Sequence, residues 1–378
     1  MKIKAAVLHQ IGGHERPYSK SNPLKIEELE LGKPGKEEVI VKIKAAGLCH
    51  SDLSVIDGNR PRQTPMVLGH EAAGIIIELG EDVKNFEIGD HVVFAFLPSC
   101  GHCEYCVSGR AALCNPGAAA NNAGVLLNGD RKITNKDGEV YYHHLGVSGF
   151  ADYAVASIHS LVKIEKDYPF EIAALFGCAV MTGVGAVVHT AKVTLGESVL
   201  VVGLGGVGLS AILGAKAAGA SKIVAADVSQ LKLDVAKEYG ATHVINSGKE
   251  SALDELKSEI TNGGVDKSVE FAGVMPALDF AFNATKKGGT TVTGALPNPN
   301  DRLSLNPLTL VGQEKSLKGC YLGSCVPTID IPNFLELYKN GNLPVDKLIT
   351  HRLKLEEINE GFERLASGEA IRQVILFD

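Results

Sequence analysis

The sequence predicts two domains of different architecture: a β-rich domain and an α/β domain built on a doubly wound parallel sheet. Short β-branched segments separated by glycines fill the first half of the chain, whereas strand-like and helix-like segments alternate from about Gly183. Such alternation predicts a parallel sheet with helices packed on its faces. The length of 378 residues is sufficient for two or three domains with sizeable cores.

Four segments of the first half have the composition of strands, at residues 37–48, 72–80, 89–96 and 150–158. Each is rich in β-branched residues, and turn signals lie between them. These segments predict a compact β-rich domain.

The second half begins with "ESVLVVGLGGVG", an apolar strand that ends in glycines, and a helix is expected over residues 207–220. A second helix is expected over 230–241. The tail from about Gly323 returns to mixed character, with helical segments and a last strand in "IRQVILFD". Further strands of the parallel sheet are expected at 221–229, 242–246, 265–273, 287–296 and 315–323.

Composition and charge restrict the partners of the protein. The chain is 45% hydrophobic and 21% charged, and its net charge is −7. This acidic balance argues against nucleic acid or an anionic membrane as a partner. The N-terminus has no apolar leader, and the longest apolar run, 172–188, is interrupted by glycines. We therefore expect a cytoplasmic protein with reduced thiols.

Four of the eight cysteines lie close together, as Cys100, Cys103, Cys106 and Cys114 in the pattern C-x2-C-x2-C-x7-C. Reducing conditions and the two-residue gaps disfavour disulfides. Tetrahedral zinc bound by four thiolates fits the spacing, and an iron–sulfur cluster is the main alternative. A zinc ion with four protein ligands has no open position, so this site would be structural.

A glycine-rich turn follows the first strand of the α/β region and carries G-x-G-x-x-G as Gly203, Gly205 and Gly208. Between a strand and a helix, such a turn allows a pyrophosphate to approach the backbone at the helix N-terminus. Asp227 ends the next expected strand, where a carboxylate can accept hydrogen bonds from ribose hydroxyls and repel a 2′-phosphate. The pattern predicts a Rossmann-type NAD-binding domain; a turn needed only for packing is the alternative.

A second set of chemically active residues is dispersed. Cys49 lies in "GLCHSD", His70 in "LGHEAAG" and Cys178 in "LFGCAVMTG". Taken singly, each is explained by ordinary turn or core packing. Together, two thiolates and one imidazole would make a three-ligand zinc site with an open fourth position for water or substrate.

In this combination the chain resembles the zinc-dependent medium-chain alcohol dehydrogenases. "GLCHSD", "GHEAAG", the four-cysteine segment, "GCAVMTG", "VGLGGVG" and "IRQVIL" all occur in the order of that family. The segment "LLNGDRKI…HHLGVSGFADY" resembles the branch with liver-type and formaldehyde-type enzymes. The resemblance implies a GroES-like catalytic domain of residues 1–179 and 323–378, with a structural zinc lobe at about 97–116, and a coenzyme domain of 180–322.

The resemblance also implies a reaction: reversible oxidation of an alcohol to an aldehyde or ketone, with zinc as Lewis acid and NAD as hydride acceptor, in a dimer or tetramer. Cys49, His70 and Cys178 match the catalytic zinc ligands. Ser51 matches the hydroxyl that takes the alcohol proton, and Asp52 the carboxylate that orients the histidine ligand. Glu71 matches an acid beside the metal, and the residues that match walls of the substrate pocket are Phe96, His144 and Leu145. The positions that match cofactor contacts are His50, Thr182, Gly203, Gly205, Gly206, Val207, Gly208, Asp227, Lys232 and Arg372.

Two departures from the family pattern bear on the substrate and on the proton. Formaldehyde-type relatives bind glutathione through a basic residue after the fourth cysteine of the lobe, but "NPGAAANNAG" follows it here. Glutathione-dependent formaldehyde oxidation is therefore the alternative reaction, and a non-catalytic dinucleotide-binding protein is the alternative from another class. Ser54 occupies the position of a relay histidine in the liver enzymes, so we hypothesise that water or buffer takes the proton directly.

Overall fold

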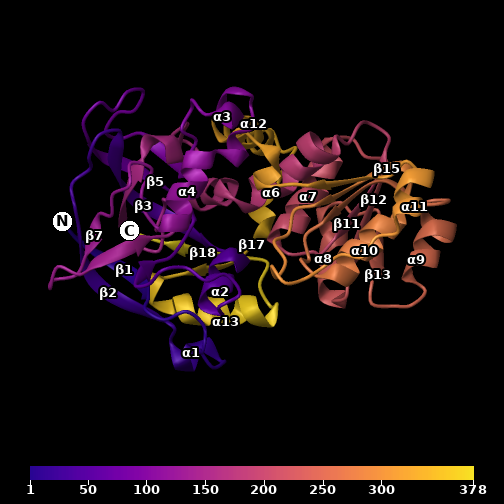
Figure 1. Ribbon diagram of the computed structural model, residues 1–378, viewed down its shortest axis with the longest axis horizontal. Helices are drawn as coiled ribbons and strands as arrows, with labels where there is room; N and C mark the ends of the chain where they lie inside the picture. The colour runs from indigo at the N-terminus through magenta and orange to yellow at the C-terminus, as the bar shows by residue number, and fades with distance from the viewer. The chain divides into compact units, whose positions relative to one another are not determined.

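The computed structural model describes all residues, 1–378, and the chain forms two compact units (Figure 1). The first unit comprises Met1–Cys178, Val326–Glu336 and Asp346–Asp378. The second comprises Ala179–Cys325 and Leu337–Val345. Each unit has sheets and a core of its own.

The first unit contains a closed barrel in which β1 and β2 pair antiparallel. Alternate residues of β1 point inward, since Ile3, Ala5 and Val7 share a buried cluster with Leu29 and Tyr141. In order around the barrel, the strands are β1 (Lys2–Leu8), β2 (Leu24–Leu31), β7 (Ile133–Thr134), β8 (Val140–His143) and β4 (Met66–Val67).

A seven-stranded sheet adjoins the barrel within this unit and includes the expected strands of the first half and the expected last strand. Its central strand β3 pairs antiparallel with β5, β9 and β18. In order, the strands are β10 (Leu161–Ile164), β6 (His91–Phe94), β5 (Glu71–Leu79), β3 (Glu38–Leu48), β18 (Arg372–Leu376) and β17 (Ile349–Leu353), with β9 (Tyr153–Ser157) also on β3.

Helices of the first unit are short, except for the two near the C-terminus. A 3-10 turn, Ala174–Gly177, leads directly to Cys178. The helices are α1 (Tyr18–Ser21), α2 (His50–Ile56), α3 (Glu104–Val107), α4 (Asn115–Ala123), α5 (Phe170–Ala173), α12 (Pro327–Lys339), whose last residues belong to the second unit, and α13 (Ile358–Ser367).

The second unit is a six-stranded sheet in which every neighbouring pair is parallel. Its strand order is that of the doubly wound dinucleotide-binding fold. In order, the strands are β13 (His243–Asn246), β12 (Lys222–Asp227), β11 (Ser198–Val202), β14 (Val265–Glu270), β15 (Thr285–Thr293) and β16 (Ser316–Gly319). The helices are α6 (Ala179–Gly185), α7 (Gly206–Ala217), α8 (Gln230–Tyr239), α9 (Ala252–Glu255), α10 (Met275–Ala284) and α11 (Pro307–Gly312).

Helices cover both faces of this sheet. Leu200 and Val202 of β11 share a buried cluster with Ala281 of α10. The intervening Val201 faces α7, because a Cβ on Gly208 would lie 3.6 Å from its side chain. Burial on both faces explains why β11 is a continuous apolar run instead of an alternating one.

The predicted fold class is confirmed: a β-rich domain is combined with a doubly wound parallel sheet. No single helix is long and apolar enough to cross a membrane. One bent pair of helical segments, 170–177 and 179–191, is long and apolar enough when the two are taken together, on length and composition alone.

Candidate active site and metal centres

The candidate metal ligands Cys49 and His70 meet because β3 and β5 are paired with Gly47 opposite Glu71. Cys49 lies two residues beyond Gly47, and His70 lies one residue before Glu71, so the two side chains leave neighbouring strand ends. A Cβ on Gly47 would lie 2.6 Å from Glu71 Oε2, so only glycine allows the glutamate to approach this closely. Strand register thus brings together residues that are distant in sequence.

Cys178 completes a buried group of possible metal ligands in the first unit. One ligating atom from each of Cys49, His70, Glu71 and Cys178 lies within 4.8 Å of the others, and all four residues are buried. His70 Nε2 and Glu71 Oε1 are buried without a hydrogen-bond partner. Buried polar atoms without partners are costly, and a bound cation would satisfy them. Two thiols and one imidazole therefore fit the three-ligand zinc site predicted from the sequence.

The charges of this group favour a cation. A hydrogen bond from the Cys178 thiol, together with nearby His70, holds the pKa of Cys49 well below its usual value, against the effect of burial. Burial lowers the pKa of His70, but the carboxylate of Asp52 and the thiolate of Cys49 outweigh it and raise the pKa to about 10. The negative groups therefore attract positive charge to this point, which a divalent metal supplies when it replaces the proton.

Asp52, in the first turn of α2, lies directly behind His70. The Asp52 Oδ1 atom is 3.0 Å from His70 Nδ1, and both side chains are fully buried. Backbone N–H groups of Gly69 and Cys49 also donate to this carboxylate, each at 3.3 Å. Burial acts to raise the pKa of Asp52, but the charge of His70 and hydrogen bonds from His144 and His70 lower it overall. The carboxylate is therefore ionised and holds His70 with Nε2 directed away from it.

Glu71 is held by Arg372, the first residue of β18. The guanidinium group of Arg372 forms a buried ion pair with Glu71 Oε2. The other carboxylate oxygen, Oε1, lies 3.9 Å from His70 Nε2. Glu71 therefore lies within this group of possible ligands, and Arg372 is engaged by Glu71. The roles that the resemblance implies for both residues stay predictions.

The other predicted residues of α2 lie on its first turns. His50 is exposed and Ser51 is half-buried, directly after the ligand Cys49. The Ser54 hydroxyl donates a hydrogen bond to the carbonyl oxygen of His50, at 2.9 Å. This serine is therefore bound to its own helix backbone.

Two of the predicted pocket residues contact His70 edge-on. The Phe96 and His70 rings are 5.3 Å apart at 89°, and those of His144 and His70 are 5.7 Å apart at 88°. Leu145, the third, has a left-handed backbone with φ of 54°. Burial lowers the pKa of His144, whose Nδ1 lies 3.2 Å from Asp52 Oδ1. The contact with Asp52 was missed in the sequence, where the only signal was the histidine pair 143–144.

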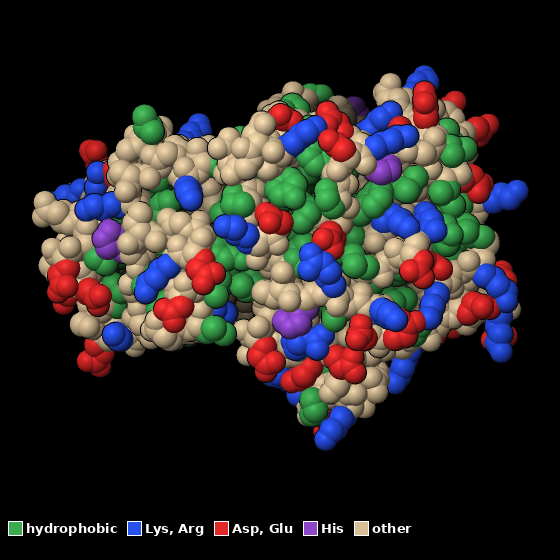
Figure 2. Space-filling model, turned by 180° about the vertical axis from the view of Figure 1, so that it is seen from behind, with side chains coloured by type: hydrophobic (Ala, Val, Ile, Leu, Met, Phe, Trp, Pro, Cys, Tyr) green, Lys and Arg blue, Asp and Glu red, His purple; other side chains and the backbone are tan.

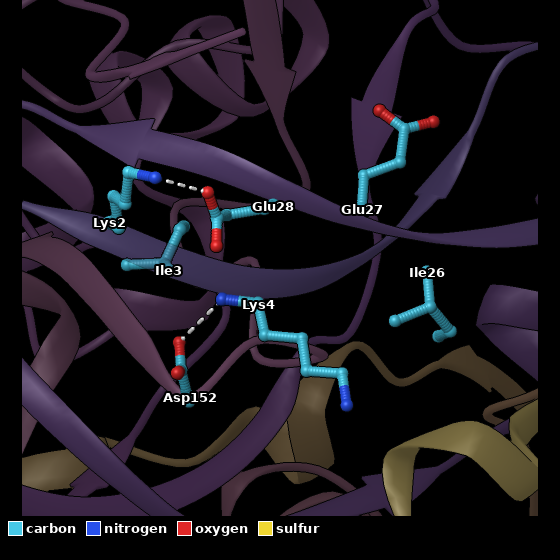
Figure 3. Close-up of a pocket in the computed structure, with 7 residues that line it drawn as sticks. All are labelled: Lys2, Ile3, Lys4, Ile26, Glu27, Glu28 and Asp152. Carbon is cyan, nitrogen blue, oxygen red and sulfur yellow. Dashed lines mark hydrogen bonds and ion pairs between the residues drawn. The ribbon is translucent and has the colours of Figure 1, made fainter. Parts of the chain in front are cut away.

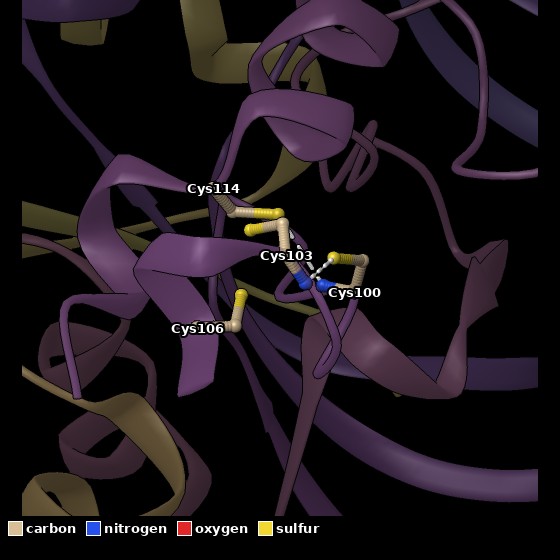
Figure 4. A group of neighbouring side chains, drawn as sticks. All are labelled: Cys100, Cys103, Cys106 and Cys114. Atoms are coloured by element: carbon tan, nitrogen blue, oxygen red, sulfur yellow. Dashed lines mark hydrogen bonds between the residues drawn. The ribbon is translucent and has the colours of Figure 1, made fainter. Parts of the chain in front are cut away.

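The four-cysteine lobe forms a second candidate metal centre. The sulfur atoms of Cys100, Cys103, Cys106 and Cys114 lie within 4.8 Å of one another and turn toward a common point (Figure 4). All eight cysteines of the chain are free of disulfides. The N–H groups of Cys100 and Gly117 lie 3.3 and 3.4 Å from the Cys114 sulfur, and a hydrogen bond from the Cys106 backbone lowers the pKa of Cys103 to about 6. Four thiol ligands and donated N–H groups fit a closed zinc site.

The glycine-rich turn of the second unit joins β11 to α7. Gly203 has φ of 86°, and a Cβ there would lie 2.5 Å from the backbone N of Ala272. Gly208 packs the helix on the strand, since its Cβ would lie 1.9 Å from the Gly203 carbonyl oxygen. Gly205, by contrast, has open space around its Cβ position at the N-terminus of α7. This geometry leaves the backbone and the helix dipole accessible to a phosphate group, with Gly206 and Val207 in the first turn of α7.

Asp227 lies at the C-terminal end of β12, beside this turn. Its Oδ2 accepts the N–H of Leu204 at 2.8 Å, and its Oδ1 accepts the N–H of Ser229 at 3.0 Å. Lys232 Nζ lies 4.0 Å from Oδ2. Thr182 is buried on α6. Asp227 and Lys232 are thus close together, whereas the nicotinamide role of Thr182 stays a prediction.

A hollow of about 310 Å³ lies away from these sites, over β1 and β2 (Figure 3). Its charged groups have partners, such as Glu28 at 2.5 Å from Lys2 Nζ, Glu356 on Lys4 and His9 on Glu27. The N–H of Lys4 donates to Asp152 Oδ1 at 3.0 Å. On the face in Figure 2, basic and acidic side chains are likewise intermixed.

Comparison with known proteins shows the same two domains. Residues 35–166 match the family model described as "Alcohol dehydrogenase GroES-like domain", and residues 206–340 match "Zinc-binding dehydrogenase". The chain is 40% identical to an NDMA-dependent alcohol dehydrogenase of Amycolatopsis methanolica, over 100% of this chain and 99% of that protein. It is 38% identical to alcohol dehydrogenase class-3 of Drosophila melanogaster, over 95% and 96% of the two chains.

A solved structure gives the same result. The benzyl alcohol dehydrogenase of Acinetobacter calcoaceticus superposes with a TM-score of 0.92 at 33% identity, over 100% of both chains. The chain therefore belongs to the zinc-containing medium-chain alcohol dehydrogenase family. Zinc-dependent alcohol dehydrogenase activity follows from that membership.

Proposed function

We propose that the protein oxidises an alcohol reversibly to an aldehyde or ketone, with NAD as the hydride acceptor. The observation that carries this proposal is the buried Cys49–His70–Cys178 group, whose ligating atoms lie within 4.8 Å of one another. The family position of the chain and the dinucleotide-type turn of the second unit support it.

Each part of the chain has a defined duty in this reaction. When bound, zinc supplies Lewis acidity to the substrate oxygen and the nicotinamide supplies a hydride acceptor. Cys49, His70 and Cys178 would hold the metal, and Asp52 keeps the His70 Nδ1 proton in place. Ser51, next to the ligand cysteine, would accept the alcohol proton through its hydroxyl.

The substrate class is restricted by α4. The helix sequence "NPGAAANNA" contains no cation that could bind the carboxylates of a glutathione adduct. Arg62, from a neighbouring segment, donates to Asn122 Oδ1 of this helix at 3.1 Å. One relative is named for benzyl alcohol, so we propose simple alcohols, aromatic or aliphatic, ahead of glutathione adducts.

The acceptor needs a direct comparison, because one relative is named as NDMA-dependent. NAD, NADP and NDMA should be tested separately with benzyl alcohol, ethanol, a secondary alcohol and a mixture of formaldehyde and glutathione. We expect turnover with NAD and a simple alcohol, and two zinc ions per chain by metal analysis. Cys49→Ser should abolish turnover, whereas Cys320→Ser, a buried cysteine outside both candidate metal groups, serves as the matched control.

The result could contradict the proposal in two ways. Turnover that requires glutathione would assign the alternative reaction, and turnover with NDMA but not with added NAD would exclude NAD as the exchangeable acceptor. Full activity in the Cys49→Ser protein would exclude the metal assignment.

We also propose that the protein is a homo-oligomer. β16 is an edge strand of the parallel sheet, so one row of its backbone groups is available for pairing. Leu308 and Val311 of the nearby helix α11 are 77% and 74% exposed. Light scattering should show a dimer or tetramer, and Val311→Lys should shift it toward the monomer; a monomeric wild type would contradict this proposal.

A further inference from the structure

Two histidines face one buried carboxylate in the first unit. Asp52 Oδ1 lies 3.0 Å from Nδ1 of His70 and 3.2 Å from Nδ1 of His144. The side chains of Asp52 and His70 are fully buried, and that of His144 is 2% exposed. His70 also belongs to the group of possible ligands with Cys49, Glu71 and Cys178, whereas His144 is grouped only with Asp52 and His70.

His144 Nδ1 has no other partner. It is buried and forms no well-aligned hydrogen bond, so the contact with Asp52 is the polar interaction available to it. A buried N–H without a partner is unfavourable, which favours a small rotation of the ring that completes a hydrogen bond to the carboxylate. An N–H donated to Asp52 places the proton of a neutral His144 on Nδ1.

The backbone holds the His144 ring in this position. The N–H of His144 donates to the Ser148 hydroxyl at 3.0 Å. Leu145 and Ser148 both have left-handed backbones, with φ of 54° and 52°. Residues other than glycine rarely adopt this conformation, because it is strained for a residue with a side chain. A loop that retains two such residues holds the ring against a local preference for other conformations.

We propose that His144 is a positioning residue for the metal centre: it donates Nδ1–H to Asp52 and thereby helps to fix the orientation of His70. The inference rests on the proposed function in one respect, namely that Cys49, His70 and Cys178 bind the metal. It adds a residue outside the Cys49–His70–Glu71–Cys178 group, whose ring contacts that of His70 edge-on and whose N–H acts on His70 through Asp52.

A role in packing alone would not need this geometry. Phe96 already contacts the His70 ring edge-on, and a second aromatic hydrocarbon would fill the space of His144 equally well. The feature that packing does not explain is a ring nitrogen turned toward a carboxylate that already accepts three other N–H groups. The test must therefore separate the N–H donor from the shape of the ring.

Two substitutions make this separation. His144→Phe keeps a ring and removes the donor, whereas His144→Asn keeps an N–H donor close to the position of Nδ1. His143→Gln is the matched control, because His143 is equally buried and accepts the N–H of Lys132 instead of facing Asp52. Each holoenzyme is mixed with a zinc chelator, and release of the two metal ions is followed in time.

We expect His144→Phe to release the catalytic metal about fivefold to tenfold faster, somewhat below the effect of losing a direct partner of a ligand. His144→Asn should stay within about twofold of the wild type, and the lobe metal should be released at the same rate in all variants. In the cobalt-substituted enzymes, the visible spectrum of the catalytic site should change in the Phe variant and not in His143→Gln. A substitution that only destabilises the fold would leave the visible spectrum of the folded, cobalt-substituted protein unchanged.

A double-substitution cycle tests whether Asp52 transmits the effect. In an Asp52→Asn background, His144→Phe should change metal release by less than about twofold, since the charged acceptor is gone. If the Phe variant is poorly soluble, His144→Leu, which also lacks the N–H donor, replaces it in the same two backgrounds.

The outcomes separate this inference from the proposed function. A wild-type protein that binds a single metal, at the lobe only, contradicts both. A wild type with two metals whose release is unchanged or slower in His144→Phe overturns the inference alone, as does an Asn variant as fast as the Phe variant. An unchanged cobalt spectrum in His144→Phe also overturns it.

Discussion

The choice between NAD and NADP is expected to depend on the carboxylate of Asp227. This side chain ends β12, is 8% exposed, and accepts N–H groups of Leu204 and Ser229 at 2.8 and 3.0 Å. Asp227→Asn is the informative substitution, because the amide oxygen can still accept one of these bonds while the charge is lost. The glycine-rich turn, to which Leu204 belongs, therefore keeps much of its support.

The size of the effect follows from hydrogen bonding and charge. A hydrogen bond to a charged group contributes about 1.5–3 kcal/mol, so the loss of the carboxylate should weaken NADH binding about tenfold to hundredfold. Two unit negative charges, here the Asp227 carboxylate and a 2′-phosphate, repel by about 4 kcal/mol at 4 Å and an effective dielectric constant of 20. Lys232, 4.0 Å from Asp227, offsets part of this repulsion for a 2′-phosphate. We therefore expect NADPH to bind about hundredfold more tightly to the variant, which corresponds to about 2–3 kcal/mol.

The assay is a fluorescence titration of each reduced coenzyme against the purified protein. Asp234→Asn is the control, since Asp234 is an exposed acid on α8 with a side chain 58% exposed. The control should leave both dissociation constants within about twofold, and raising the salt concentration should reduce the NADPH effect in part. If the wild type binds NADPH as tightly as NADH, or if Asp227→Asn changes neither constant, Asp227 does not select the coenzyme.

Three further predictions concern the metal lobe, acid stability and proton transfer. Cys103→Ser should lose one zinc ion and stability on the order of several kcal/mol, measured by thermal unfolding, while kcat/KM per folded molecule changes little. A large fall in kcat/KM at full stability would contradict a structural role for the lobe. Burial lowers the pKa of His143 from 6.5 to about 4, so its stabilising contribution is complete above pH 6.5 and is lost as the pH falls toward 4. Urea unfolding should show the wild type losing about 3 kcal/mol more than His143→Gln over that interval, and parallel pH profiles would refute this. Ser51→Ala should lower kcat about hundredfold or more, because it removes the hydroxyl that accepts the alcohol proton. Ser54→Ala should stay near the wild type, because the Ser54 hydroxyl is bound to the His50 carbonyl. Equal losses of kcat in the two variants would refute Ser51 as the first proton acceptor.

Local sequence patterns predicted much of the fold. The strands β3, β5 and β11–β16 were expected because β-branched residues and flanking glycines mark them directly. The barrel strands β1 and β2 were not expected. β2, with the sequence "LKIEELEL", alternates irregularly between buried and exposed positions and carries three glutamates, so its strand character comes from pairing with β1.

The candidate site could be predicted only in its components. The four-cysteine lobe is local in sequence, so its spacing indicated a metal site without knowledge of the fold. Cys49, His70 and Cys178 are individually ordinary, and only the family resemblance joined them. The contact between Asp52 and His144 had no signal in spacing, because it depends on a loop with left-handed residues at Leu145 and Ser148.

The reason for this limit is strand register. The antiparallel pairing of β3 with β5 sets Gly47 opposite Glu71, and the pairing of β18 with β3 sets Gly47 opposite Val374. Three strand ends from distant parts of the chain therefore meet, and each contributes a different group: a thiol after β3, an imidazole before β5 and a guanidinium at the start of β18. A shift of one residue in either pairing would turn these side chains to the other face of the sheet. The chemistry of the site thus depends on the cores that fix the register, which is why substitutions in β3 that leave every ligand in place should still impair metal binding.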